Sequence, residues 1–290
     1  MIEVLPFVVA GLATAGVYVL SGVGIVVLYR ASGVINLSQG ALGALAALIA
    51  WNIDRSTGGQ LAGWLIGIAA ATALSVAYGR LIAPRLAKAD PMVQAIATLA
   101  FAIILMGAMN IVWGELPRRL RLPTDAIGVE LFGVRVTYTR ILAFGLSIAV
   151  AVAVFAFLRF TRLGLAMRAV ADNRELASLR GVQTGRADLT AWFLSGVLSA
   201  VSGLIFADLT RFSAQSLTFL VVPAVATALL GGLVSLPVTV LGGIAIGVGE
   251  AVLTLVPGVS SYRSAVVFVV ATLAIIWSVR RPSNGFVVRI

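Results

Sequence analysis

Glu250 is the one acidic residue that lies well inside a long apolar run of the sequence. Burying an ionised carboxylate in hydrocarbon is costly, so this side chain must face protein or water, or carry a proton. A carboxylate in such a place can line or gate a path across a membrane. It can equally pack between helices, hydrogen-bonded to a backbone group or a hydroxyl. Both interpretations of Glu250 remain open at the level of the sequence.

A second polar group lies between Gly33 and Gly40, near the start of another apolar run. A helix broken here would turn backbone amides and polar side chains towards a zwitterionic solute such as an amino acid. The alternative is that Asn36 or Ser38 caps the N-terminus of a helix. The residues that we take as a candidate translocation pathway are Asn36, Ser38, Gln39, Gly40 and Glu250.

The most polar stretch of the chain runs from about residue 159 to 188 and carries six arginines. Within it, Arg168, Asp172 and Glu175 are spaced i, i+4 and i+7, which predicts one face of a single helix. Gly181 predicts the end of that helix. Three leucines offer apolar contacts: Leu165, Leu176 and Leu179. Such a helix can dock on a soluble partner, or it can be a solvated, positively charged loop that sets topology.

Several kinds of chemistry are excluded by residues that the chain lacks. It has 0 Cys and 0 His, and Lys88 is its only lysine, so it contains no G-x-x-x-x-G-K-[ST] phosphate-binding loop. The usual nucleophile and base pairings are absent as well. We therefore expect no catalytic residues, no metal site and no cofactor. The net charge of +10 lies largely in short loops, which indicates membrane orientation rather than nucleic-acid binding.

The elements that must position these residues are transmembrane helices. The chain is 60% hydrophobic and 11% charged, and its apolar residues recur in runs long enough to span a bilayer. The sequence predicts an all-α, polytopic membrane protein with one domain, residues 1–290, and about eight or nine transmembrane or re-entrant helices. The runs lie at about 7–28, 34–51, 61–83, 92–113, 141–158, 189–208, 218–235, 237–256 and 264–279.

Two features of this arrangement depend on local sequence. The apolar stretch 218–256 is interrupted by Pro223, Gly231, Gly232 and Pro237, so it is either two spans or one span with a re-entrant hairpin.

Placing the loop 159–188 in the cytoplasm puts most of the basic residues on the inner side. The N-terminus is then external and the C-terminus, with Arg280 and Arg281, is cytoplasmic.

The sequence also resembles a known family. Glu175, Ala177 and Gly181 match the E-A-A-x-x-x-G signature in the cytoplasmic loop of ABC importer permeases, with Leu176 in place of the usual Ala. The string TRLGLAMRAVADNRE, from residue 161, is similar to branched-chain amino acid permeases of the LivH and LivM type. So are GVINLSQGALGALAAL, from residue 33, and LLGGLVSLPVTVLGGIAIGVGEAVL, from residue 229. The family often carries His where Gln39 stands, and the length is nearer to LivH.

This resemblance implies a permease subunit that translocates branched-chain or similar small amino acids across the inner membrane. It also implies two ABC ATPase subunits, a second permease subunit that is LivM-like or a copy of this one, and an extracytoplasmic substrate-binding protein. The ATPase-coupling residues would be Glu175, Ala177, Gly181, Arg168 and Asp172. Two rival classes remain. One is a stand-alone ion- or proton-coupled secondary transporter with Glu250 as the relay, and the other is a structural membrane subunit without a pathway.

Overall fold

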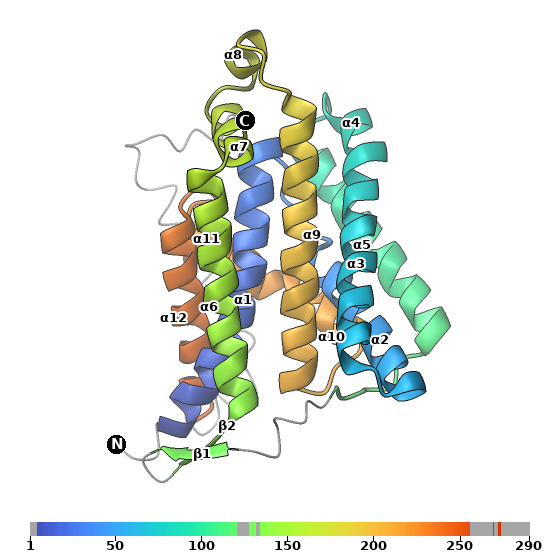
Figure 1. Ribbon diagram of the computed structural model, residues 1–290, viewed down its shortest axis with the longest axis vertical. Coiled ribbons are helices and arrows are strands. Elements are labelled where there is room, and N and C mark those ends of the chain that lie inside the picture. Colours follow the sequence, from blue (N-terminus) through green and yellow to red (C-terminus); the bar gives the residue numbers. More distant parts are fainter. Residues whose placement is uncertain (1–4, 121–127, 132–133, 256–268, 270–271, 274–290) are drawn as a thin grey trace.

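A computed structural model describes residues 5–120, 128–131, 134–255, 269, 272 and 273. These residues form a bundle of mostly antiparallel helices (Figure 1). The helices are α1 Leu5–Ser32, α2 Gln39–Thr57, α3 Gln60–Leu81, α4 Ala83–Leu86, α5 Pro91–Trp113, α6 Tyr138–Phe160, α7 Arg162–Asp172, α8 Arg174–Leu179, α9 Thr184–Leu209, α10 Ala214–Thr218, α11 Val221–Leu230 and α12 Leu236–Leu253. The predicted helical fold is confirmed.

A short β-hairpin is the exception, and the sequence analysis did not predict it. Strands β1, Gly128–Leu131, and β2, Val134–Thr137, pair antiparallel, with Gly128 opposite Thr137. The hairpin lies at the end of the bundle where α1 begins and α12 ends (Figure 1). It directly precedes α6, so it belongs to the connection between two long helices rather than to the helical core.

Six helices in the described part of the chain are long and apolar enough to cross a membrane. They are Pro6–Ser32, Gln60–Leu86, Pro91–Trp113, Tyr138–Phe160, Thr184–Leu209 and Leu236–Leu253. The multi-pass architecture is therefore confirmed, whereas the total of eight or nine segments stays a prediction. Most of the predicted run 264–279, together with Arg280 and Arg281, lies outside the described residues.

The two remaining predicted runs are not continuous helices. The run 34–51 becomes helical only at Gln39, because residues 33–38 form an irregular linker that begins with Gly33 at a φ of 74°. The run 218–235 is divided into α10 and α11. Residue Phe212 pairs with Arg118 at one end of the bundle, and Val234 lines a cavity with Arg30 at the other. Between Phe212 and Val234 the chain thus runs from one end of the bundle to the other in short pieces, and α12 then runs back as one long apolar helix.

Local sequence explains where several of these helices begin and end. Asp90 accepts a hydrogen bond of 2.8 Å from the Met92 amide, and Pro91 occupies the first turn of α5, where its missing N–H costs nothing. The hydroxyl of Thr161 accepts from the Gly164 amide at 3.0 Å and starts α7. Gly58 ends α2 in the left-handed conformation, with a φ of 66°.

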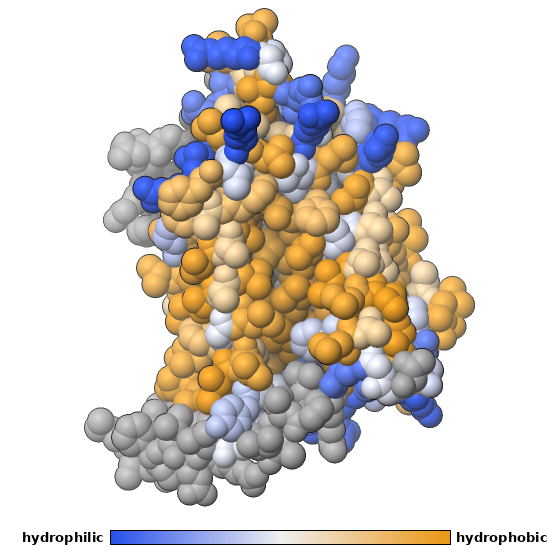
Figure 2. Space-filling view, viewed as in Figure 1, coloured by the Kyte–Doolittle hydropathy of each residue, from blue (hydrophilic) through white to orange (hydrophobic). Residues whose placement is uncertain are grey.

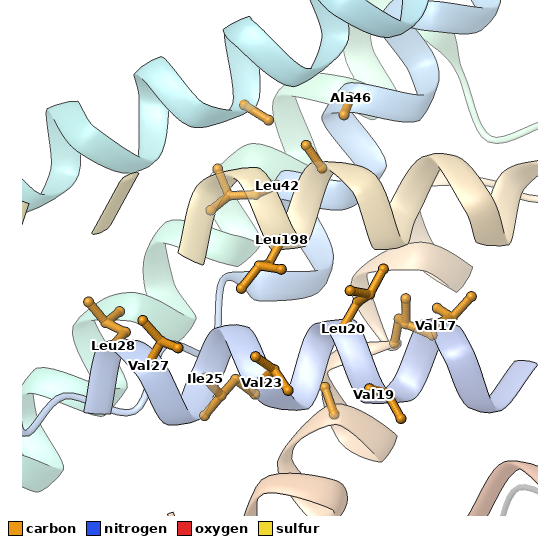
Figure 3. Close-up of a cluster of buried hydrophobic side chains, with 14 of the residues drawn as sticks. Val17, Val19, Leu20, Val23, Ile25, Val27, Leu28, Leu42, Ala46 and Leu198 are labelled. Carbon is orange, nitrogen blue, oxygen red and sulfur yellow. The ribbon is translucent and has the colours of Figure 1, made fainter. Parts of the chain in front are cut away.

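Helix α1 is the centre of the bundle. It is apolar on all sides, as expected for a helix with neighbours all round, and it contacts α6, α9, α11 and α12. Figure 3 shows that Leu20 lies on the side of α1 that faces Leu198 of α9, whereas Ile25 lies on the other side of α1. Because α1 touches helices on both sides, it connects the α2–α3–α9 group to α6 and α12.

Arginines gather at one end of the bundle. Figure 2 shows an apolar band around the middle and hydrophilic residues gathered at the end that carries α4, α7 and α8. Arginines occupy the last turns of the helices that finish there: Arg30 of α1, Arg80 of α3, Arg85 of α4 and Arg159 of α6. We call this the basic end, and the end with the β-hairpin the opposite end. These four arginines, which the orientation rule assigned to one side, are thus together in space.

Candidate functional site

Asn36, in the linker between α1 and α2, is the centre of a buried polar cluster. Its side-chain oxygen accepts hydrogen bonds from the amide and the hydroxyl of Ser38, at 3.0 and 2.6 Å. Its side-chain nitrogen lies 3.4 Å from the hydroxyl of Ser195 on α9. All three side chains are buried. Asn36 therefore closes the turn that leads into α2, and it also ties that turn to α9. The N-cap residue of α2 is Ser38, whose side chain makes no capping hydrogen bond, so the side-chain cap of the capping interpretation is not present.

Gln39, the first residue of α2, is held by α9 over one helical turn. The Ser195 hydroxyl donates to the Gln39 side-chain oxygen at 3.0 Å, and the Gln39 side-chain nitrogen lies 3.5 Å from the Ser195 carbonyl oxygen. The Ser199 hydroxyl donates to the backbone carbonyl of Gln39. Since Gln39 is 1% exposed and fully partnered, it is not available to a solute in this conformation.

Gly40 and Thr98 complete the packing around this cluster. A Cβ atom on Gly40 would lie 2.6 Å from the carbonyl oxygen of Leu217, so only glycine allows α2 and α10 to approach this closely. The hydroxyl of Thr98, on α5, accepts from the Leu37 amide at 3.0 Å, and its one proton is shared between the carbonyls of Ala95, at 2.8 Å, and Ile35, at 3.1 Å. The linker is thus fixed by three different helices.

Glu250 has a different environment from the polar cluster. It lies near the C-terminal end of α12, and the hydroxyl of Tyr18 on α1 donates a hydrogen bond of 2.7 Å to one of its carboxylate oxygens. The two helices can approach because glycines face them: a Cβ on Gly247 would lie 2.6 Å from the backbone nitrogen of Ala15. Glu250 is therefore bound by a hydroxyl, as the packing interpretation predicted.

Glu250 also lines a cavity, as the pathway interpretation requires. This outer cavity has a volume of about 350 Å³ and lies between α1, α6, α9 and α12 in the half of the bundle nearer the β-hairpin. Most of its wall is apolar, from residues such as Ala10 and Leu209, and its polar lining includes Thr14, Tyr18 and Arg140. An acidic group inside a span is expected to face protein partners or a water-filled space, and Glu250 faces both.

The five candidate pathway residues therefore form two separate places. Asn36, Ser38, Gln39 and Gly40 lie where α2 meets α9 and α10, and none of them lines the outer cavity. Glu250 lies between α1 and α12, beside Tyr18. The first group is close in space because its residues are adjacent in sequence, at the end of the linker and the start of α2. Glu250 comes from α12, which packs elsewhere on α1.

At the basic end, the predicted single helix face of Arg168, Asp172 and Glu175 is wrong. Helix α7 ends at Asp172, and Asn173 is extended, with a φ of −153° and a ψ of 107°. The side chain of Asn173 accepts from the Leu176 amide at 2.9 Å and so starts a second helix, α8. Asn is favoured at helix N-caps, because its side-chain oxygen can accept a hydrogen bond from a backbone N–H of the first turn. Here the new N-cap interrupts the helical periodicity on which the prediction relied.

Arg168 and Asp172 thus belong to α7, away from the tip. They line an inner cavity of about 800 Å³ between α7 and the end of α1, together with Arg30 and Arg174. One Arg168 nitrogen also donates to the Arg159 carbonyl at 3.3 Å. Glu175 lies in the first turn of α8, where a negative charge complements the helix dipole.

Gly181 ends α8 as predicted, and the geometry gives the reason. Its φ is 80°, and its amide donates to the Ser178 carbonyl at 3.0 Å, while the Val182 amide donates to the Ala177 carbonyl at 3.0 Å. These two bonds define a Schellman motif, which requires a left-handed residue at this position. A β-branched side chain would be strained there.

The side chains of α8 point in two directions. Ala177 is 5% exposed and packs on its own chain beside Val182. Leu179 and Leu176 are 83% and 49% exposed. The helix that carries them, α8, protrudes from the basic end of the bundle (Figure 1). The small residue of the signature therefore serves the internal packing of this segment, and the two leucines are the apolar groups left for a partner.

An ion pair that the sequence analysis missed fastens α8 to α9. Both terminal nitrogens of Arg174 donate to the two carboxylate oxygens of Asp188, at 3.0 and 2.6 Å. This hydrogen bond and the negative charge of Asp188 raise the pKa of Arg174 above its ordinary value, against the lowering effect of partial burial. The bidentate geometry fixes the orientation of α8 relative to α9.

Other contributors were also not singled out from the sequence. Ser195 and Ser199 are spaced i, i+4 within an apolar run, a pattern of hydroxyls on one helix face that could have indicated a polar contact. Tyr18 and Arg140 carry no such local signal. Their proximity to Glu250 depends on how α1, α6 and α12 pack.

These features define a polytopic membrane protein. It has two distinct ends, a buried polar cluster around Asn36, and a cavity that is lined by an acidic side chain. Residues 7–276 match the sequence profile of a family described as branched-chain amino acid transport system / permease component. The chain belongs to this family of transport permeases. As a member, it is a transport component rather than an enzyme.

Relatives in bacteria and archaea agree with this assignment. The permease LivH of Salmonella typhimurium strain LT2 is 25% identical over 257 residues, covering 83% of each chain, and its name describes high-affinity branched-chain amino acid transport. BraD of Pseudomonas aeruginosa, with the same description, is 25% identical over 259 residues and 84% of each chain. The solved PsaBC from Streptococcus pneumoniae in complex with Fab has a TM-score of 0.46 at 16% identity, over 92% of this chain and 88% of that one.

Proposed function

We propose that this permease is the membrane subunit of an ATP-driven importer that moves branched-chain or similar small amino acids across the inner membrane. Support comes from relatives whose names describe branched-chain amino acid transport and which align over most of both chains. The chain has no phosphate-binding loop, which is consistent with ATP hydrolysis by partner subunits. The partners that we propose are two ABC ATPases, a second permease subunit, an extracytoplasmic binding protein and the surrounding lipid, without nucleic acid.

The observation that carries this proposal is the shape and chemistry of α8. It protrudes from the basic end on a fixed Schellman turn, and it presents Leu179 and Leu176 to the outside. Exposed leucines at a tip beyond the apolar band are unfavourable in water and gain from burial in a partner groove. We infer that this tip docks on an ATPase, with the basic end and the C-terminus in the cytoplasm.

A route for transmitting movement follows from the contacts of α9. Arg174 and Asp188 join α8 to the start of α9, and Ser195 and Ser199 join the middle of α9 to Gln39 at the start of α2. Helices held by buried polar contacts and close glycine packing move as rigid bodies. We propose that ATPase closure displaces α8 and α9 together, and that the contacts of α9 with Asn36 and Gln39 carry this displacement to α2.

Co-purification tests this proposal against its rival. The tagged full-length chain should retain two ATPases and a second permease in mild detergent, and addition of the substrate-loaded binding protein should stimulate ATP hydrolysis. A stand-alone ion-coupled transporter is the alternative that the accessible position of Glu250 in a cavity favours. That alternative is supported if the chain purifies without ATPases and transports amino acids alone under an ion gradient.

A further inference from the structure

The outer cavity contains two opposite charges that do not neutralise each other. Glu250 of α12 and Arg140, near the start of α6, both line it. Within the part of the chain that the structure describes, neither side chain forms an ion pair. An acid and a base that face one cavity without pairing are complementary to a ligand that carries both signs of charge.

The walls of the cavity restrict the chemistry of such a ligand. Apart from its polar lining, the cavity is enclosed by small and apolar side chains, including Ala10, Ala13 and Leu209. Its volume of about 350 Å³ is at the small end of ligand pockets, which span roughly 300–1,000 Å³. A compact zwitterion with an aliphatic side chain therefore fits better than a long or doubly charged solute.

The contacts of Glu250 give its carboxylate a defined orientation. One oxygen accepts the 2.7 Å hydrogen bond from Tyr18, which is 5% exposed, so this part of the site is preorganised. The guanidinium of Arg140 can bind a carboxylate through two parallel hydrogen bonds, which a lysine cannot do. Phe7 and Tyr18 both line the cavity and are eleven residues apart, a rise of roughly 16 Å along α1. The cavity thus reaches towards the middle of the bundle.

We propose that the outer cavity binds the zwitterion of an aliphatic α-amino acid, with Glu250 holding the ammonium group and Arg140 the carboxylate. This inference rests on the proposed function, because it gives the permease its own substrate site at the end opposite to α8. The site receives solute after release from the binding protein and discriminates by charge as well as by size.

Direct binding to the purified full-length permease complex, without the binding protein, is the first test. The probes are L-leucine, leucinamide, which lacks the carboxylate, and 4-methylpentanoate, which lacks the amine. Glu250→Gln and Arg140→Gln should each weaken leucine binding at least tenfold, while leucinamide should be insensitive to Arg140→Gln and 4-methylpentanoate to Glu250→Gln. The matched controls Glu115→Gln and Arg211→Gln do not line the cavity and should leave leucine binding unchanged.

A second test does not depend on changing either charge. The chain has 0 Cys, so Thr14→Cys places a single thiol in the cavity, one turn from Tyr18. Leucine should slow its reaction with a charged thiosulfonate reagent at least fivefold, and leucinamide or 4-methylpentanoate at the same concentration should not. Equal labelling rates with and without leucine overturn the site, even if the Glu250 or Arg140 variants fail to fold.

The outcomes separate this inference from the function on which it rests. If the parental complex imports leucine, but Glu250→Gln and Arg140→Gln bind it as well as the two controls do, the cavity is not the site and the importer stands. If the parental complex neither binds nor imports any aliphatic amino acid, the proposed function itself fails.

Discussion

The hydroxyl of Tyr18 donates a 2.7 Å hydrogen bond to Glu250, joining α1 to α12 across 232 residues of sequence. Glycines on both helices make this contact possible, because Gly11 and Gly247 allow the two backbones to approach. The bond holds a charged side chain at the wall of a cavity within an apolar bundle. Packing between helices and exposure to a cavity are therefore not alternatives for Glu250, since one oxygen is bound by Tyr18 while the side chain lines the cavity.

Removal of this hydrogen bond should affect transport more than stability. Tyr18→Phe keeps the ring and deletes the donor, and water in the cavity can still hydrate Glu250, so the cost in stability should be about 1 kcal/mol. We expect leucine uptake to fall several-fold while the complex remains assembled. The measurement is uptake by proteoliposomes alongside thermal unfolding of the same preparation. Unchanged uptake would show that the orientation of Glu250 does not matter.

The turn at Gly181 should be essential for coupling but not for membrane insertion. Gly181→Val places a β-branched residue at a φ of 80°, which costs on the order of 1–2 kcal/mol and distorts the Schellman motif. We expect normal abundance in the membrane, with loss of bound ATPase and of substrate-stimulated hydrolysis. Gly185→Ala is the control, since no atom lies near its Cβ position and its φ is not positive. Arg186→Gln, outside the signature, should also be well tolerated.

Two substitutions in α8 should impair ATPase binding for different reasons. Leu179→Asp changes an 83% exposed side chain, so the permease should fold normally and lose affinity for the ATPases. Ala177→Arg forces a large charged group into a 5% exposed position and should loosen the segment itself. Limited proteolysis of the 173–183 region distinguishes them, with faster cleavage in Ala177→Arg alone. Full ATPase retention by Leu179→Asp would contradict docking through this tip.

The orientation is open to a direct test in intact cells, because the chain has 0 Cys. Single cysteines at Leu179, on the basic end, and at Glu115, on the opposite end, should differ in their reaction with a membrane-impermeant maleimide. We expect labelling of Glu115→Cys from outside, and labelling of Leu179→Cys only after the cells are opened. The reverse pattern would place α8 outside and remove it from any cytoplasmic partner.

The sequence predicted most of the helical architecture, because long apolar runs determine spans almost independently of their neighbours. It also located Gly181, since only glycine fits a left-handed helix end. The single helix through Arg168 and Glu175 was wrong because helical periodicity alone does not reveal that Asn173 starts a new helix. Contacts such as that between Tyr18 and Glu250 could not be predicted, because they depend on which helices pack together.

The surroundings of the candidate pathway residues could not be predicted for the same reason. Hydropathy identified Glu250 and the Asn36–Gln39 cluster as unusual, since polar groups in apolar runs need a reason. Whether each polar group is buried against partners or faces a cavity depends on residues from distant helices. Ser195 closes the cluster around Asn36, whereas no described side chain forms an ion pair with Glu250.

The most direct test of the account is amino acid uptake by proteoliposomes that contain this permease with its two ATPases, the second permease and the binding protein. We predict that leucine accumulates only with ATP on the side of α8 and with the binding protein on the other side. Accumulation should persist when ionophores collapse the proton and sodium gradients, and it should stop with Gly181→Val. Uptake by this chain alone, driven by an ion gradient without ATP, would contradict the importer mechanism.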